Sequence, residues 1–370
     1  MLVALWNGQP LSSIHLKEKK ETPWYHAQTF YCPSCRQPVV LKVGELRVPH
    51  FAHRRQSDCT SDFSEGESIA HLLGKQQLFH FFQKACLHVE LEKRLPQLQQ
   101  RPDLFVYTAQ QQWAIEFQCS RIPVADIERR TAGYVNYGIE PIWILQQKRT
   151  LSLSVQKMKL SNFEQQFIRH NTLLTYCPYA KQFTYYAHLL PVTKTQFFTV
   201  IHQMPLSQQT FPFAQIRPIN EVQFQQYWQL LHYEKPMYIM NRIRYSKRGV
   251  QDLFLRAFYT LRLTPYTIPN FIGIPIDIHN ELKESIIEWQ LLLFAYCQQS
   301  GCEVTSIDEW HIRNFLKWMQ IHITTKAIQV IQQYVMILRT CAIHTVKDQS
   351  ENSLLFSVVY RQFIAFNFKN

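Results

Sequence analysis

The stretch from Asp103 to Ser120 constrains the fold of this chain more than any other, because it predicts a β-hairpin. Two runs, LFVYT and WAIEFQCS, are rich in β-branched and aromatic residues and flank a short polar segment. If the turn centres on Ala109 and Gln110, Asp103 and Glu116 lie the same distance from it and face each other across the hairpin. Their β-carbons would then be about 5 Å apart.

Two carboxylates at that separation need a compensating cation, because like charges repel and a buried ionised group is costly. The two-residue alternation of a strand also places Gln118 on the same face as Glu116. Oxygen ligands suit Mg²⁺ or Mn²⁺, which can polarise a phosphoryl oxygen and activate water. The spacing therefore predicts a catalytic metal site at Asp103 and Glu116. The alternative is that both acids hold ordinary surface or salt-bridge positions.

A helix is predicted before the hairpin, from about residue 62 to residue 82. Ser64 and Glu67 have the spacing of a capping box at its start. Glu67, His71 and Lys75 follow one another at four-residue intervals and share a helix face. For His71 and Lys75 the alternative to a functional role is a solvated helix face.

The elements around the hairpin predict a compact α/β unit over residues 61–150. Extended runs at 87–95, 103–108 and 113–120 follow the first helix. A second helix is predicted to start at Pro123 and to end at Gly138, and the apolar run at 141–147 indicates a buried strand. The predicted order is therefore helix, three strands, helix, strand.

Residues 1–60 predict a small β-rich module that holds a zinc ion. Two residues separate Cys32 from Cys35, and two separate His50 from His53, which is the spacing of a Cys2His2 zinc site. The histidine pair can converge only if its backbone turns, because strand residues three apart face opposite ways. Cys59 is a spare thiol that could replace one histidine. The alternative is two unrelated cysteines and two core histidines.

Composition points to an anionic partner, either nucleic acid or a membrane surface, and to a reducing compartment. The 370 residues carry a formal net charge of +12, which favours an anionic partner. Nine cysteines, an odd number, suit the cytosol better than a disulfide framework. The N-terminus does not resemble a signal peptide, and no apolar run is long enough for a membrane span. We therefore expect a cytoplasmic protein without a membrane partner.

Residues 151–370 are predicted to form a C-terminal domain with a small β-meander at 173–204 and mostly helices from about residue 220. One segment of it, NRIRYSKRG, carries cations together with a ring that could stack on a base. Its candidate DNA-binding residues are Arg242, Arg244, Lys247 and Arg248, with Tyr245 among them. The alternative is an exposed loop without a ligand.

Several motifs, taken in their order, resemble those of the competence protein CoiA family of Gram-positive bacteria. They are CPSC…HFAH, GESIAHLLGK, RPD, AIEFQCSRI and IWIL, which fall between about residues 25 and 150. An acid followed by Glu-x-Gln on a hairpin, after a helix that carries a glutamate, also resembles the PD-(D/E)XK nuclease core. The resemblance implies a restriction-endonuclease-like α/β fold. It also implies a role in processing or recombining DNA taken up during natural transformation.

Carried over residue by residue, the resemblance gives Asp103 and Glu116 as ligands of Mg²⁺ or Mn²⁺ and Glu67 as an accessory acid. Gln118 stands where this nuclease class has a lysine, which orients the attacking water and offsets charge in the transition state. Lys75 could supply that missing charge from the preceding helix.

The departure at Gln118 keeps a second hypothesis open. The first hypothesis is a Mg²⁺- or Mn²⁺-dependent DNA nuclease that acts on single-stranded DNA or a recombination intermediate. The second is a non-catalytic DNA-binding mediator on the same fold, which would work with the RecA-type recombination machinery. A purely structural adaptor is a third possibility, which the positioned acids make less favourable.

Overall fold

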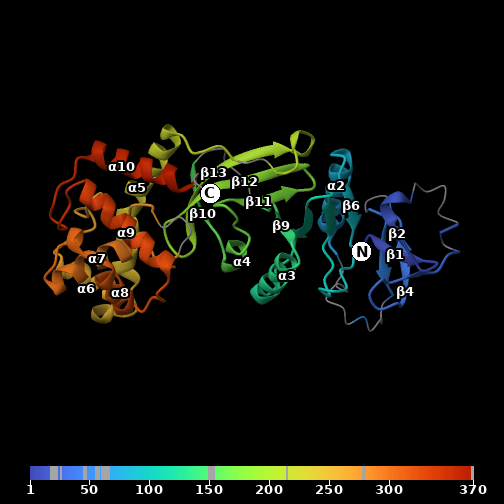
Figure 1. Ribbon diagram of the computed structural model, residues 1–370, viewed down its shortest axis with the longest axis horizontal. Coiled ribbons are helices and arrows are strands. Elements are labelled where there is room, and N and C mark those ends of the chain that lie inside the picture. Colours follow the sequence, from blue (N-terminus) through green and yellow to red (C-terminus); the bar gives the residue numbers. More distant parts are fainter. Residues whose placement is uncertain are drawn as a thin grey trace.

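The computed structural model describes residues 1–16, 24–25, 27–44, 48–54, 59, 67–148, 155–213, 216–276 and 281–367. The molecule is elongated, with a small sheet at one end, a large sheet with helices in the middle and a group of helices at the other end (Figure 1). Ser64 of the predicted capping box lies outside the described residues. Among the residues described, no helix combines the length and the apolar character needed to cross a membrane.

In the part of the chain that the structure describes, the small sheet has five strands in the order β2-β1-β3-β4-β5. They are β1 (Val3–Trp6), β2 (Gln9–Ser12), β3 (Phe30–Tyr31), β4 (Pro38–Lys42) and β5 (His50–His53), and the 3-10 turn η1 (Ser13–His15) follows β2. Asn7 and Gly8 join β1 to β2 with positive φ at both residues, as a tight hairpin turn requires. The core of this sheet is small and centres on Phe30 and Phe51, so it gains little stability from burial alone.

Among the described residues, the large sheet has eight strands in the order β10-β13-β12-β11-β9-β8-β7-β6. They are β6 (His88–Leu91), β7 (Leu104–Tyr107), β8 (Gln112–Gln118), β9 (Ile139–Gln146), β10 (Gln156–Lys159), β11 (Leu173–Cys177), β12 (Gln182–Pro191) and β13 (Gln196–Pro205). β9 pairs in parallel with both β8 and β11, and the other neighbouring strands are antiparallel. The β-meander predicted at 173–204 therefore continues the same sheet, and the boundary predicted at residue 150 falls inside it.

Helices pack on the two faces of the large sheet around β8. On one face, α2 (Ile69–Lys84) shares a core with Phe117, and on the other, Tyr134 of α3 (Val124–Asn136) packs against Ala114. Alternate residues of β8 thus point to different helices, as the strand period requires. The order α2, β6, β7, β8, α3, β9 confirms the predicted succession of helix, three strands, helix and strand.

The β7–β8 hairpin has the predicted register. Its pairs run from Leu104 with Ile115 to Tyr107 with Gln112, and the Thr108 amide donates to the Gln111 carbonyl across the turn at 2.8 Å. The turn therefore centres on Ala109 and Gln110, and Asp103 and Glu116 are one step beyond the last pair. The helix α2 is positioned above this end of the hairpin.

The start of α2 and its approach to the sheet both depend on small side chains. Ser68 caps the helix, and its hydroxyl accepts from the His71 amide at 3.2 Å. A β-carbon at Gly74 would lie 2.1 Å from a ring carbon of Phe117, so only glycine permits this contact. The helix begins at Ile69 and not near residue 62 as predicted, so Glu67 lies just before its N-cap. The close approach brings Glu67, together with His71 and Lys75 of α2, to the end of the hairpin.

The remaining helices form a separate hydrophobic core near the C-terminal end of the chain. The longer ones are α5 (Glu221–Tyr245), α6 (Leu253–Thr260), α7 (Ile286–Ser300), α8 (Glu309–Trp318), α9 (Thr325–Thr340) and α10 (Asn352–Asn367). The described residues also form the short elements α4 (Asn162–Gln165), η3 (Leu206–Gln208), η4 (Gly249–Gln251) and η5 (Val304–Ser306). The predicted helical character of the chain beyond residue 220 is confirmed.

Lys235 of α5 is buried in this helical core, and no carboxylate of the described residues forms an ion pair with it. Its ammonium donates to the carbonyls of Pro269 at 3.1 Å and Asn270 at 3.4 Å, and its side chain is 2% exposed. Burial lowers the pKa of Lys235 from 10.5 to about 7. Between those two pH values the unfolded chain binds one more proton than the folded chain, so the free energy of unfolding rises with pH.

We therefore expect Lys235→Met to stabilise the protein most at or below pH 7 and progressively less toward pH 10. From well below pH 7 to well above pH 10, the difference in unfolding free energy between Lys235→Met and wild type should change by about 5 kcal/mol, since a difference of one pKa unit corresponds to about 1.36 kcal/mol. Denaturant unfolding of both proteins at several pH values measures it. Lys317→Met, at an exposed position, is the matched control. A constant difference between Lys235→Met and wild type across this range would contradict the prediction.

Candidate functional site

One potential metal-binding group is formed by Glu67, just before the N-cap of α2, by His71 of α2 and by Asp103 at the start of the hairpin. A ligand atom from each of Glu67, His71 and Asp103 lies within 4.8 Å of the others. His71 Nε2 is 3.1 Å from Asp103 Oδ2, and His71 Nδ1 is 3.5 Å from Glu67 Oε1. The donor set of two carboxylates and one imidazole fits a divalent cation such as Mn²⁺. The sequence placed Glu67 and Asp103 in the site but did not assign His71 a role as ligand.

Lys75 lies directly beneath this group and has no exposed surface. Its ammonium donates to Glu67 and, at 2.6 Å, to Glu92 Oε1, and it lies 3.7 Å from Asp103 Oδ1. Burial would lower the pKa of Lys75, but the surrounding carboxylates outweigh burial and raise it above its usual value. Lys75 therefore carries a fixed positive charge at the acids, as its place on the helix face suggested.

The acids around Lys75 are ionised for the same reason. Burial would raise the pKa of Glu67 and of Asp103, but the charges of Lys75 and His71 hold both pKa values below their usual range. Asp103 also accepts a hydrogen bond from the Phe117 amide at 2.9 Å. This bond turns the Asp103 carboxylate over the end of the hairpin, toward α2.

Glu92 is a member of this network that the sequence analysis missed. It follows β6 with a positive φ of 49° and is 4% exposed. Its carboxylate accepts from the backbone amides of Leu2 at 2.8 Å and Val3 at 3.4 Å, and Arg101 lies 3.7 Å away. Burial raises the pKa of Glu92, but Lys75 and Arg101 outweigh this and bring it to about 2. The sequence feature that could have indicated Glu92 is its place in the apolar run LHVELEKRL. Glu90 has the same place in that run but is a surface residue paired with Lys93, so the feature does not separate the two.

Glu116 is held on the other face of the sheet. Arg130 and Tyr134 of α3 both donate to its Oε1, Tyr134 at 2.6 Å. Burial, opposed by Arg130 and assisted by the charge of Asp103, raises the pKa of Glu116 to about 7. The predicted pairing of Glu116 with Asp103 as metal ligands is therefore corrected. The two residues are opposite in register, but Asp103 precedes β7 and turns to α2, whereas Glu116 obeys the strand alternation and turns to α3.

Gln118 and Lys75 differ in how they relate to the site. The Gln118 amide donates to the Ser120 carbonyl at 2.8 Å, so the side chain is bonded within its own chain segment at the end of β8. Lys75 contacts Glu67 and Glu92 and approaches Asp103. The cation near the acids thus comes from the first helix and not from the position of Gln118.

A second potential metal site lies in the small sheet and has a different ligand set from the predicted one. Ligand atoms of Cys32, Cys35, His53 and Cys59 all lie within 4.8 Å of one another. Cys35 Sγ is 3.3 Å from His53 Nε2, and the Ser34 amide donates to Cys32 Sγ at 3.4 Å. Three thiols and one imidazole are a donor set that suits tetrahedral Zn²⁺.

His50 is the ligand that the structure replaces with Cys59. His50 and His53 are three residues apart on β5, so their side chains leave opposite faces of the strand. The ring of His50 is bonded through Nδ1 to the Val48 carbonyl at 2.9 Å. The backbone turn that a Cys2His2 site would have needed does not occur, because β5 pairs with β4 through both histidines.

The two potential metal sites are connected through the backbone of the small sheet. Arg94, just after Glu92, donates to the carbonyl of Pro33 within the CPSC motif at 2.7 Å. Leu2 and Val3 belong to the core of the large sheet as well as donating to Glu92. The second oxygen of Glu67 lies 2.9 Å from the Met1 nitrogen. The small sheet therefore forms part of the wall of the acid site.

The C-terminal basic residues do not act as one group. Arg242 donates to Asp252 at 2.9 and 3.1 Å and to Glu288 at 2.6 and 3.3 Å, so it joins α5 to α6 and α7. Its predicted role in DNA binding is corrected, because its donors are used within the fold. Arg244, Lys247 and Arg248 are exposed, and none of them has an ion pair within the described part of the chain.

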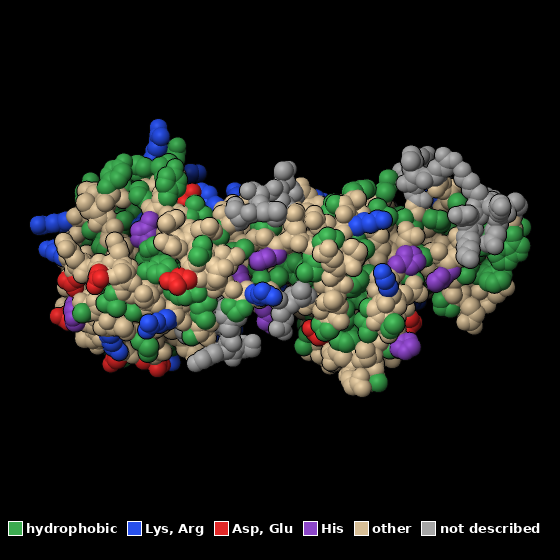
Figure 2. Space-filling view, turned by 90° about the horizontal axis from the view of Figure 1, so that it is seen from above, with side chains coloured by type: hydrophobic (Ala, Val, Ile, Leu, Met, Phe, Trp, Pro, Cys, Tyr) green, Lys and Arg blue, Asp and Glu red, His purple; other side chains and the backbone are tan. Residues whose placement is uncertain are grey.

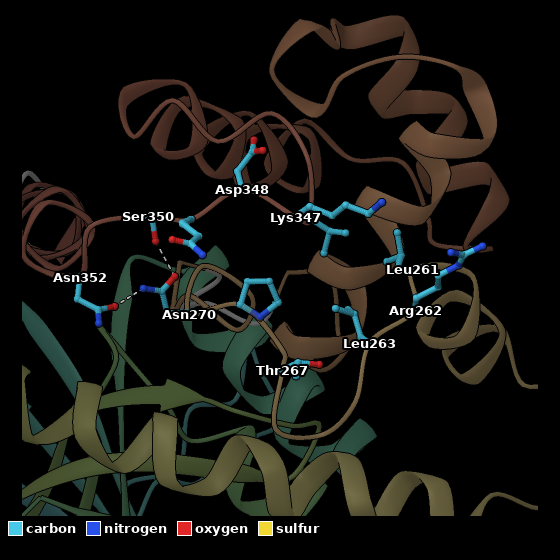
Figure 3. A pocket seen from close by; sticks show the side chains of 12 residues that line it. Leu261, Arg262, Leu263, Thr267, Asn270, Lys347, Asp348, Ser350 and Asn352 are labelled. Atoms are coloured by element: carbon cyan, nitrogen blue, oxygen red, sulfur yellow. Dashed lines mark hydrogen bonds between the residues drawn. The ribbon is translucent and has the colours of Figure 1, made fainter.

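A surface pocket of about 600 Å³ lies in the helical part, between the loop after α6 and the loop before α10 (Figure 3). Arg262 and Lys347 line it, and Asn270 within it is hydrogen-bonded to Ser350 and Asn352. It contains none of the residues predicted for catalysis or metal binding. The acid site therefore lies outside this pocket, at the large sheet and α2.

The chain is similar to known proteins over most of its length. The family model described as the CoiA N-terminal domain matches residues 13–62, and the one described as the CoiA nuclease-like domain matches residues 67–216. Competence protein CoiA of Bacillus subtilis (strain 168) is 26% identical over 324 residues, which are 85% of this chain and 83% of that protein. No solved structure matches. The two matched regions together cover more than half of the chain, in the order of its cysteine and acidic motifs, and the chain belongs to the competence protein CoiA family.

Proposed function

We propose that this protein processes DNA during natural competence by metal-dependent hydrolysis of phosphodiester bonds on a PD-(D/E)XK-like core. The observation that carries the proposal is the convergence of Glu67, His71 and Asp103 above the buried ammonium of Lys75. These residues lie in the region that resembles the CoiA nuclease-like domain, and the similar protein of Bacillus subtilis is named for competence. Action on internalised DNA would place the protein in the cytoplasm.

Glu67, His71 and Asp103 would hold the catalytic cation. A bound Mg²⁺ or Mn²⁺ would polarise a phosphoryl oxygen and lower the pKa of a coordinated water. An imidazole ligand favours Mn²⁺ over Mg²⁺, which prefers oxygen ligands and retains its waters. Lys75 keeps both carboxylates ionised and in place, and its charge offsets negative charge that develops near Asp103.

The proposal is tested by incubating the purified protein with end-labelled single- and double-stranded DNA in the presence of Mg²⁺, Mn²⁺ or EDTA. We expect cleavage that depends on the cation, that is faster with Mn²⁺ and that EDTA abolishes. Stable DNA in every mixture would refute the nuclease activity.

The roles of Lys75 and Gln118 can be separated in the same assay. We expect Lys75→Met to reduce the cleavage rate at least about a hundredfold, because the acids lose the charge that orders them. Gln118→Ala should change the rate by less than about threefold, since Gln118 is bonded to Ser120 and not to the acids. Circular dichroism and thermal unfolding check that the variants fold. A larger effect at Gln118 than at Lys75 would assign the lysine's role to Gln118.

A second candidate function is supported by the contacts of Glu116. Its carboxylate is occupied by Arg130 and Tyr134, and Gln118 replaces the usual lysine, which together suit a fold retained for binding. On this hypothesis the protein binds a recombination intermediate and assists the RecA-type machinery without cleavage. It predicts that Asp103→Asn still supports transformation in cells, whereas the nuclease hypothesis predicts that it does not.

A further inference from the structure

We propose that the solvent-exposed face of α5 binds single-stranded DNA. This face, called the α5 stripe below, consists of Tyr233, Met237, Met240 and Arg244 together with Tyr266 from the loop after α6. The inference rests on the proposed function and adds the form of DNA that the protein holds.

The geometry of α5 places these residues in one line. Positions 233, 237, 240 and 244 are spaced by four, three and four residues, which puts them on one helix face over roughly 16 Å at 1.5 Å per residue. Tyr233 is 74% exposed and Met237 is 48% exposed. Tyr266, 77% exposed, joins the stripe through its hydroxyl, which lies 3.6 Å from Met240 Sδ.

The fold fixes which face of α5 points outward. Leu231, Lys235 and Ile239 on the opposite face are buried in the helical core. Arg242, also on the inner side, anchors the last turns through Asp252 and Glu288. The residues of the α5 stripe that belong to α5 therefore lie on the helix face that points away from the core.

Charge favours an anionic ligand at the C-terminal end of the stripe. Arg244, Lys247 and Arg248 are exposed and have no ion pair among the described residues. The nearby acids are neutralised, because Glu234 pairs with Lys157 and Asp252 pairs with Arg242. Figure 2 shows hydrophobic side chains beside projecting Lys and Arg side chains on the helical part of the molecule.

Exposed rings next to unpaired cations suit single strands better than duplexes. Tyrosine rings and methionine side chains can stack on bases only where the bases are not already stacked within a duplex. The guanidinium of Arg244 lies 5.7 Å from the Tyr245 ring, which adds a cation and a ring at the same end of the helix. A duplex could use the cations alone, through its phosphates.

Fluorescence anisotropy with a labelled 15-nucleotide dT strand and a 15-base-pair duplex, both without added Mg²⁺ or Mn²⁺ to prevent cleavage, tests the proposal. We expect Tyr233→Ala with Tyr266→Ala to weaken single-strand binding at least about tenfold and duplex binding less than about twofold. The double Tyr→Phe variant should bind like wild type, because phenylalanine still stacks. Tyr179→Ala, at a position 66% exposed in the large-sheet region, is the matched control.

The cations and the rings should differ in salt dependence. Replacing Arg244, Lys247 and Arg248 with Ala should weaken binding to both DNA forms and reduce the single-strand salt slope by about 2, since each phosphate contact contributes about 0.7. The Tyr→Ala variant should keep the wild-type slope, because stacking releases no counterions.

Three outcomes would overturn the proposal. The first is an unchanged single-strand affinity in the double Tyr→Ala variant, and the second is an equal loss of single-strand and duplex affinity in that variant. The third is a variant that binds both DNA forms like wild type but binds vesicles of anionic lipid more weakly. The last would assign the stripe to a membrane surface. Asp103→Asn should retain single-strand binding. A wild-type protein that binds the single strand but cleaves no DNA with Mg²⁺ or Mn²⁺ would refute the nuclease activity and leave the α5 stripe in place.

Discussion

Asp103→Asn is expected to lower metal-dependent DNA cleavage at least about a hundredfold while the fold stays intact. Asn is neutral and so loses the charge that holds a divalent cation, but its side-chain oxygen can still accept from the Phe117 amide. The end of the hairpin should therefore keep its conformation. The rate of cleavage of labelled DNA at saturating Mn²⁺ measures the effect, and Glu67→Gln should cause a loss of similar size.

Asp126→Asn provides a matched control for charge removal. Asp126 is an acid at the start of α3 whose nearest cation is the exposed Arg129, away from the potential metal ligands. Its substitution should leave the cleavage rate within about twofold of wild type. If Asp103→Asn cleaves as fast as this control, Asp103 binds no catalytic metal.

The second large effect is expected at the thiols of the small sheet. We expect about one Zn²⁺ per chain, and Cys32→Ser or Cys59→Ser should release it and unfold the small sheet. The expected loss is large because zinc binding supplies on the order of 10 kcal/mol of folding free energy to such modules, and this sheet has only a small core of its own. Elemental analysis gives the zinc content, and hydrogen exchange of residues 1–53 reports the unfolding.

His50→Gln is the informative control for the ligand set. The His50 ring is bonded to the Val48 carbonyl and is not in the group formed by Cys32, Cys35, His53 and Cys59. We therefore expect this variant to keep its zinc. Loss of zinc from His50→Gln, or wild-type protein without zinc after purification free of chelators, would contradict the predicted site.

The local geometry of the acid site was predictable from sequence because it depends on short-range rules. The turn at Ala109 and Gln110 sets the register of β7 and β8, and helical spacing places His71 and Lys75 on one face of α2. Glu67, predicted on the same helix, lies just before its N-cap. The CPSC spacing likewise brings two thiols together in the small sheet.

The partners of these residues were not predictable, because they come from distant parts of the chain. Glu92 joins Lys75 to the backbone of Leu2 and Val3, and the amide of Leu2 is ninety residues from Glu92 in sequence. Arg242 looked like a DNA contact within a basic segment, but Glu288 lies opposite it only after α5 packs on α7. Buried charges take the partners that packing provides, and a sequence pattern carries no record of those contacts.

The sequence by itself therefore determined which elements form and which side chains share a strand face or a helix face. Only the tertiary structure decided where those side chains turn at the ends of the elements. Asp103 turns to α2 because it lies before β7, whereas Glu116 is inside β8 and is bound by Arg130. Cys59 replaces His50 because β4 holds β5 extended through both of its histidines. In each case a long-range packing contact fixed the orientation that local periodicity had left open.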